Sequence, residues 1–239
     1  MKSLKLLSLL TLVLGHEAMG KVSYKVQVGE CPTHPVTKLA ATLAKEYENG
    51  ESLLDLKKKI LSDNLQEKFY LSSYDISLDP RKSRLTFEFN CPKPLLKVSV
   101  LRKDQQNEVT TAILTADGKL FDPTYEAFLR EDKKLPYALP NLAVPYTEVE
   151  KFSWTGLAKV MGDQREEFRR KFSELILNSN GELTLILSLD ERPSSVFFGD
   201  NEWEEKFKKL EKIVNYFEKK NKIPAVVNLK NSKKVVVKF

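Results

Sequence analysis

Apolar positions near the C-terminal end of the chain change from a helical period to a strand period. From Trp203 to Phe217 they recur every three or four residues, with Lys and Glu between them. This spacing predicts a helix that begins at an Asp200/Asn201 cap. Two β-rich runs follow, at 225–229 and 235–239, joined by a polar turn. The chain stops with the second run, so we expect a sheet edge that is open to pairing with another chain.

The first part of the chain alternates between strand and helix patterns. An alternating run at Lys21–Val28 predicts a strand, and the apolar spacing within Val36–Tyr47 predicts a helix that Asn49-Gly50 ends. A second helix is expected to start at Ser52-Leu-Leu-Asp55. Strands are predicted at about 69–78 and at 84–90. Residues 21–94 are therefore expected to form a small domain of β-α-α-β-β order, with two helices on one face of three strands.

The prolines of Pro92-Lys-Pro94 mark a boundary, beyond which residues 95–239 are expected to form a larger domain. The Asp117-Gly118 pair predicts a hairpin. Strand patterns recur through this part, at 96–101, 110–114, 120–121, 183–187 and 196–198.

Two segments of the larger domain lack a strand pattern. Residues 132–147 carry three prolines and are predicted to be mostly loop. After Gly162-Asp163, helical spacing predicts a helix with Phe168, Phe172, Leu175 and Ile176 on it. The predicted fold class is therefore α+β: a β-α-α-β-β domain followed by a larger, mostly antiparallel sheet with two helices.

The N-terminal twenty residues have the layout of an export signal. A short basic head is followed by an apolar run, Leu6–Leu14, and then by the small residues Ala18 and Gly20. The run is about half of the ~20 residues that a transmembrane helix needs. Residues 1–20 are thus expected to be a signal peptide or a short membrane anchor.

Charge and cysteine content narrow the possible environments and partners. The net charge is +6, but the lysines are scattered over helix faces and turns, which argues against a nucleic-acid site. Cys31 and Cys91 each follow a predicted strand and precede a proline. In an exported chain they permit one disulfide, and two unpaired thiols remain the alternative.

The sequence contains no pattern that points to catalysis. Its two histidines are His16, in the export segment, and His34, between two prolines, and no Cys/His spacing suggests a metal site. No glycine-rich phosphate loop or nucleophile motif is present. Acidic pairs such as Asp190-Glu191 and Glu166-Glu167 are best interpreted as surface charge. We therefore expect no catalytic residue, no metal, no cofactor and no small-molecule substrate.

Short motifs along the chain keep a characteristic order and spacing. A proline turn follows Ile76 at the end of the first unit, and the Leu114–Phe121 hairpin precedes the pairs Leu135-Pro136 and Leu139-Pro140. In this order they resemble the FtsQ/DivIB family of bacterial cell-division proteins, over most of residues 21–239. The first unit is similar to the family's POTRA domain.

The end of the chain carries the strongest part of this resemblance. Its motifs are Val196–Gly199, Lys206 and Leu210 on the following helix, Val227-Asn-Leu229 and Val235–Val237. Family members usually have Asp and Arg where this chain has Asn228 and Lys230.

The resemblance implies a non-catalytic scaffold on the periplasmic side of the bacterial cell envelope, which recruits division proteins during septum formation. Its last strand would pair with an extended segment of an FtsB-like partner, which comes with an FtsL-like protein. A second edge is expected at the strands Lys21–Val28 and Leu85–Phe89, and a membrane surface is a further candidate partner. The residues expected at the main site are Val227, Leu229, Val235, Val236, Val237 and Phe239.

Two other functions remain open at this point. A POTRA-type module of an outer-membrane assembly or secretion system would bind unfolded strands by the same edge pairing. An exported wall-remodelling enzyme would need a cleft lined by carboxylates. Proline at Val236 would probe the edge, because it removes one backbone N–H and breaks pairing where that donor faces the partner.

Overall fold

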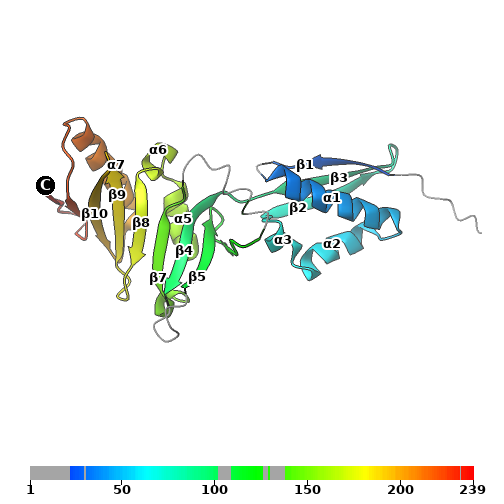
Figure 1. Ribbon diagram of the computed structural model, residues 1–239, viewed down its shortest axis with the longest axis horizontal. Coiled ribbons are helices and arrows are strands. Elements are labelled where there is room, and N and C mark those ends of the chain that lie inside the picture. The colour runs from blue at the N-terminus through cyan, green and yellow to red at the C-terminus, as the bar shows by residue number, and fades with distance from the viewer. Residues whose placement is uncertain (1–21, 30, 102–108, 126–128, 130–137, 232) are drawn as a thin grey trace, which may run out of the picture.

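The protein is elongated, with two sheets side by side along its long axis (Figure 1). The computed structural model describes residues 22–239 apart from 30, 102–108, 126–128, 130–137 and 232. The export signal predicted for residues 1–20 lies outside the described residues. None of the helices in the described part combines the length and apolar content that crossing a membrane requires.

The first sheet has three strands in the order β1-β3-β2. β1 runs parallel to β3, and β2 runs antiparallel to it, so β3 is the central strand. The elements of this unit are β1 (Ser23–Gln27), α1 (Thr33–Glu48), α2 (Leu53–Ser62), the short α3 (Leu65–Lys68), β2 (Ser73–Asp79) and β3 (Arg84–Asn90). The predicted β-α-α-β-β order is confirmed, with α3 as an added turn of helix.

Local sequence signals define the two main helices of this unit. Gly50, at φ +104°, follows the end of α1, a conformation that glycine adopts without steric cost. The Ser52 side chain accepts a hydrogen bond from the Asp55 N–H, and Asp55 accepts one from the Ser52 N–H, which closes a capping box at the start of α2. Both helices pack on the same face of the sheet, against Leu85, Phe87 and other buried strand residues.

The second sheet has nine strands in the order β12-β11-β10-β9-β8-β7-β4-β5-β6. Its strands are β4 (Pro94–Leu101), β5 (Val109–Thr115), β6 (Leu120–Phe121), β7 (Asn141–Pro145), β8 (Phe172–Leu177), β9 (Leu183–Leu189), β10 (Arg192–Gly199), β11 (Val226–Asn228) and β12 (Val236–Lys238). The pairs β4–β7, β7–β8 and β10–β11 are parallel, and the other five are antiparallel. The α+β class is confirmed, with a sheet of mixed direction.

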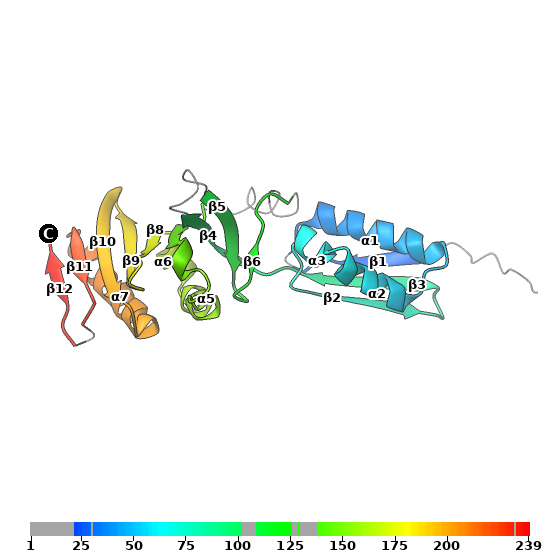
Figure 2. The ribbon, with the colours of Figure 1, turned by 90° about the horizontal axis from the view of Figure 1, so that it is seen from below.

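The helices of the second unit cover one face of its sheet. They are η1 (Tyr146–Glu148), α5 (Trp154–Gly162), α6 (Glu166–Arg169) and α7 (Trp203–Glu218). Figure 2 shows α5 and α7 on the same side of the strands. Leu157 of α5 and Phe207 of α7 belong to one continuous core with Leu142, Leu185 and Val227 of the sheet. On the opposite face, Leu129 lies beside Lys97, Ser99 and Thr111 of β4 and β5.

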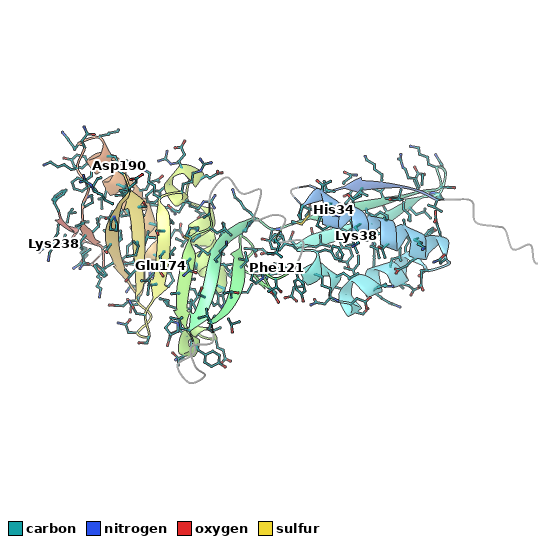
Figure 3. All side chains as sticks on the ribbon, in the orientation of Figure 1. His34, Lys38, Phe121, Glu174, Asp190 and Lys238 are labelled. Atoms are coloured by element: carbon teal, nitrogen blue, oxygen red, sulfur yellow. A yellow bond between two sulfur atoms is a disulfide. The ribbon has the colours of Figure 1, made fainter. Side chains whose placement is uncertain are left out.

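A small apolar cluster joins the two units. The ring of Tyr70, which follows α3, packs edge-on against Phe121 of β6, with ring centroids 4.8 Å apart. Tyr70 is 1% exposed, and Ile113 and Leu139 complete the cluster. Figure 3 shows Phe121 at the junction between the two sheets.

The prediction of a helix after Gly162-Asp163 is wrong for most of the residues it covered. Only α6 is helical, and Phe172–Leu177 forms β8 in the middle of the sheet. A register shift between Phe172 and Glu174 places both Phe172 and Leu175 on the core side. This bulge gives a strand the three-residue apolar spacing that normally indicates a helix.

Two further elements were not expected from the pattern. β7 lies within 132–147, which was predicted to be mostly loop, and it is flanked by Pro140 and ends at Pro145. Its Leu142 and Val144 are fully buried between two parallel neighbours. α5 begins where Ser153 Oγ accepts a hydrogen bond from the Gly156 N–H at 3.2 Å.

Other boundaries differ by a few residues. β2 begins at Ser73 rather than near Phe69, because Tyr70 has a positive φ of 58° after α3. The N-terminal cap of α7 is Glu202 rather than Asp200/Asn201. The Asp117-Gly118 hairpin is confirmed between β5 and β6, with Gly118 at φ +79°.

Candidate partner-binding edge

The strand β12 forms the outer edge of the large sheet. Among the described strands it pairs with β11 alone, and it lies at the end of the molecule farthest from the first sheet (Figure 1). Figure 3 places Lys238 at this outer end. The predicted edge strand is therefore present as an edge in the described sheet.

The direction of the backbone groups in β11 follows from its bonds to β10. The Ala225 carbonyl accepts a hydrogen bond from β10 at 2.9 Å, and the Leu229 N–H donates one to β10 at 2.8 Å. Backbone groups of successive strand residues point to opposite sides. The N–H and C=O of Val226 and Asn228 therefore point the other way, toward β12.

This alternation continues into β12. Lys238 lies opposite Val226, and Val236 lies opposite Asn228. The Lys238 carbonyl accepts a hydrogen bond from the Ala225 N–H at 2.9 Å, so it points toward β11. The N–H and C=O of Val237 therefore point to the open side of the sheet. The same alternation, continued past each end, directs the amides of Val235 and Phe239 outward.

The side chains of the predicted site residues divide into three groups. Val227 and Leu229 are 0% and 1% exposed, so they belong to the core and offer a partner no side-chain surface. Val235 and Val237 are half-buried on the α7 side. Val236 is 41% exposed on the opposite face of the sheet. The six predicted residues are thus close together, but only four reach the surface.

Phe239 lies at the tip of the edge. The residue is 68% exposed, and its ring packs edge-on against Phe217 of α7, with centroids 5.2 Å apart. The Lys222 ammonium lies 5.9 Å from the centre of the same ring. Phe239 and Phe217 therefore form an accessible aromatic pair beside the open strand.

Two lysines form hydrogen bonds that hold the start of the segment between β11 and β12. The Lys206 ammonium is buried in α7 and donates to the carbonyls of Phe198, Asn201 and Lys230 at 2.8, 2.9 and 3.3 Å. The Lys230 ammonium bonds both carboxylate oxygens of Glu182, at 2.7 and 2.8 Å. The Lys230 hydrogen bond, followed by that of Asn180, holds the pKa of Glu182 below its usual value.

Sequence reasoning assigned no role to the Lys206 ammonium. A signal was present, because Lys206 lies on the helical stripe of Trp203, Phe207 and Leu210, where the other positions face the core. A lysine at such a position must find hydrogen-bond acceptors or avoid burial.

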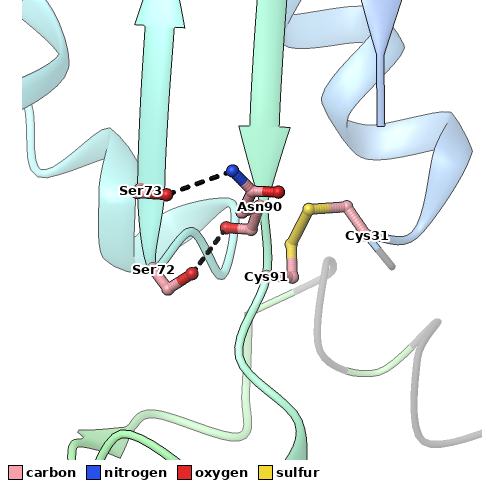
Figure 4. Close-up of a disulfide and its surroundings, with 5 residues drawn as sticks. All are labelled: Cys31, Ser72, Ser73, Asn90 and Cys91. Atoms are coloured by element: carbon pink, nitrogen blue, oxygen red, sulfur yellow. Dashed lines mark hydrogen bonds between the residues drawn. A yellow bond between two sulfur atoms is a disulfide. The ribbon is translucent and has the colours of Figure 1, made fainter. Parts of the chain in front are cut away.

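The structure joins Cys31 and Cys91 in a disulfide, one of the two alternatives that the sequence left open. Figure 4 shows the bridge at the end of β3, next to the Asn90 side chain and Ser73. It ties the start of α1 to the segment that leads into the second sheet. Disulfides of this kind are typical of extracytoplasmic compartments.

The second predicted edge is only partly correct. β1 is an edge strand, but the predicted strand Leu85–Phe89 forms the central β3 and is paired on both sides. The Ser23 N–H points toward β3 and donates to the carbonyl of Ser83, the residue directly before β3, at 3.2 Å. The Tyr24 N–H therefore points to the open side of β1.

No described group of His, Cys, Asp or Glu side chains has an arrangement that would hold a metal ion. Glu166, from one of the acidic pairs, bonds Arg170 at 2.8 Å, and this contact lowers the Glu166 pKa. Asp190 and Glu191 form the turn between β9 and β10, both with positive φ. Glu166 thus forms a surface ion pair, and Asp190 and Glu191 lie in a tight turn.

Comparison with protein families identifies the larger unit. Residues 104–230, just over half of the chain, match the family model described as cell division protein FtsQ/DivIB, C-terminal. The match ends at Lys230, so β12 and the first sheet lie outside it. No individual curated protein matches the chain. On the strength of the family match and of the fold that contains it, this chain belongs to the FtsQ/DivIB family of cell division proteins.

Proposed function

We propose that this chain is a non-catalytic, extracytoplasmic scaffold of cell division, whose strand β12 recruits a partner by strand addition. The observation that carries the proposal is the outward-directed backbone of Val237 at an edge with no further strand among the described residues. An extended peptide bound there would gain main-chain hydrogen bonds along β12. The partner is an FtsB-like protein, accompanied by an FtsL-like protein.

The two faces of β12 offer different contacts to such a peptide. On the α7 side, Val237 and the Phe217–Phe239 pair form an apolar surface. On the other face, Val236 and Lys238 are exposed. Apolar residues at alternate positions of the peptide would therefore contact the α7 side, and this alternation would supply specificity.

The charge around the edge favours an acidic partner segment. Lys233, Lys234 and Lys238 are all exposed on β12 or directly before it. Lysines on an edge strand also oppose pairing between two copies of the same chain. An acidic peptide would bind this edge faster than a neutral one, and its association rate would fall as salt concentration rises.

The first unit is proposed to be a separate POTRA-like domain, residues 21–94, that presents β1 to other division proteins. The disulfide within this unit and the family membership both support an extracytoplasmic location. Residues 1–20 would deliver the chain there, as a cleaved signal or as a short anchor.

Binding of a purified FtsB/FtsL-type complex to the full chain tests the proposal. A chain that ends at Asn231 lacks β12 and is expected to lose binding. Tyr24→Pro is the matched control, because it blocks the open side of β1 and leaves β12 intact. Equal binding by the full and shortened chains would refute the edge site. Loss of binding in Tyr24→Pro alone would transfer the site to the first sheet.

A further inference from the structure

Lys206 is the most deeply buried ammonium group among the described lysines. Lys206 is 2% exposed, and the hydrogen bonds of its ammonium all go to neutral oxygens rather than to a carboxylate. A charged group in such a site is retained only if hydrogen bonds replace its water. The side chain therefore depends on the exact chain segments that supply those oxygens.

The acceptors come from three separate segments. Phe198 is at the end of β10, Asn201 is in the turn that enters α7, and Lys230 follows β11. The Asn201 side chain adds a fourth oxygen, at 3.0 Å. Three N–H groups thus serve four acceptors, and one ammonium holds the helix, the sheet and the outgoing chain together.

Lys230 is fixed from its other sides as well. Its N–H donates to Asn228 Oδ1 at 3.0 Å, and its ammonium bonds Glu182 on the neighbouring hairpin. A Cβ on Gly199, which has φ +75°, would contact Lys230 Cα at 3.6 Å, so the two backbones approach closely. The chain therefore leaves β11 in a direction that these contacts define.

We propose that Lys206 is a positioning residue for the edge strand: by holding the Lys230 carbonyl, it sets the path on which the chain turns and returns as β12. This inference rests on the proposed function for its consequence, which is that a displaced β12 pairs poorly with a partner strand. The positioning itself is a property of the free protein and is measured without any partner.

Hydrogen exchange of the full chain, followed amide by amide, tests this role. In Lys206→Met, the inward amides of Val236 and Lys238 are expected to exchange at least ten times faster than in the wild type. Amides of β8 and β9 are expected to change less than twofold. Lys212→Met, which alters an exposed lysine of the same helix, is the control and should leave all of these rates unchanged.

Two results would overturn the proposal: unchanged exchange in β12, or equal acceleration throughout the sheet, which is what a general structural role produces. A measurement on the wild type covers the case in which Lys206→Met does not fold. The Lys206 ammonium should give a slowly exchanging NMR signal that is coupled to the Lys230 carbonyl, whereas a freely rotating, rapidly exchanging ammonium contradicts the inference. Failure of partner binding in the wild type would refute the scaffold proposal and leave these results unaffected.

Discussion

Val237 lies directly opposite Val227 in the last strand pair of the sheet. Opposed residues of an antiparallel pair direct their side chains to the same face, so burial of Val227 in the core fixes the Val237 side chain on the α7 side. Val237 lies between Val236 and Lys238, whose backbone groups face β11. The N–H and C=O of Val237 therefore point to the open side of the sheet. Val237 is thus a surface donor and acceptor, although its side chain is half-buried.

Proline substitutions at adjacent positions of β12 should have different effects. Val237→Pro removes an outward N–H and is expected to weaken partner binding at least about tenfold, with little change in thermal stability. Val236→Pro removes an N–H that faces β11, so it should destabilise β12 itself. The proline probe suggested by the sequence at Val236 therefore tests strand formation rather than partner pairing.

Calorimetry of partner binding and thermal unfolding of both variants measure these effects. Full binding by a folded Val237→Pro chain would show that this amide does not pair with the partner.

Removal of the disulfide should destabilise the first unit. Cys31 and Cys91 are 60 residues apart, and the chain-entropy model gives about 4 kcal/mol for closing a loop of that length. Both tryptophans, Trp154 and Trp203, lie in the second unit. In a double Cys→Ser variant, urea unfolding followed by circular dichroism should therefore shift more than unfolding followed by tryptophan fluorescence.

A reducing agent supplies the control for this prediction. It should destabilise the wild type to the level of the Cys→Ser variant and leave that variant unchanged. If the wild type does not respond to reduction, the bridge adds no stability.

Tyr70→Ala should loosen the junction between the two units. Tyr70 is almost fully buried against Phe121, and loss of a buried aromatic side chain typically costs about 3–5 kcal/mol. Small-angle scattering should show a broader distribution of distances between the units. Tyr70→Phe keeps the ring and should retain the wild-type profile. An unchanged profile in Tyr70→Ala would mean that other contacts fix the junction.

The ion pair between Glu182 and Lys230 should make the link to β12 sensitive to acid. Because the folded chain lowers the Glu182 pKa, its stabilisation is fully present above the ordinary value near 4.5 and is lost as pH falls through the lowered pKa. The stability difference between the wild type and Glu182→Gln should therefore shrink in acid. Urea unfolding at several pH values measures it, and a difference independent of pH would exclude this charge effect.

The sequence was most informative where one local pattern decided the structure. The helix start at Ser52–Asp55, the Asp117-Gly118 hairpin, the helix at Trp203–Phe217 and the final edge strand were all predicted from such patterns. In each case the residues that create the signal are neighbours in the chain. The order of the first unit followed from the same kind of evidence.

The elements that escaped prediction depend on distant parts of the chain. The bulge near Phe172 gives β8 a helix-like spacing, and β7 is stabilised by parallel neighbours rather than by its own proline-rich sequence. The valine run of β12 does not reveal which backbone groups face outward, because that depends on its register with β11. The acceptors of Lys206 likewise come together only in the folded chain.

The most direct test of the edge-strand account is amide exchange in β12 before and after an FtsB/FtsL-type complex binds. The account predicts that the amides of Val236 and Lys238 are already protected in the free chain. Binding should newly protect the amide of Val237, together with those of Val235 and Phe239. If the complex binds at saturation and the Val237 amide remains as exposed as before, the partner does not pair with β12 and the central claim is wrong.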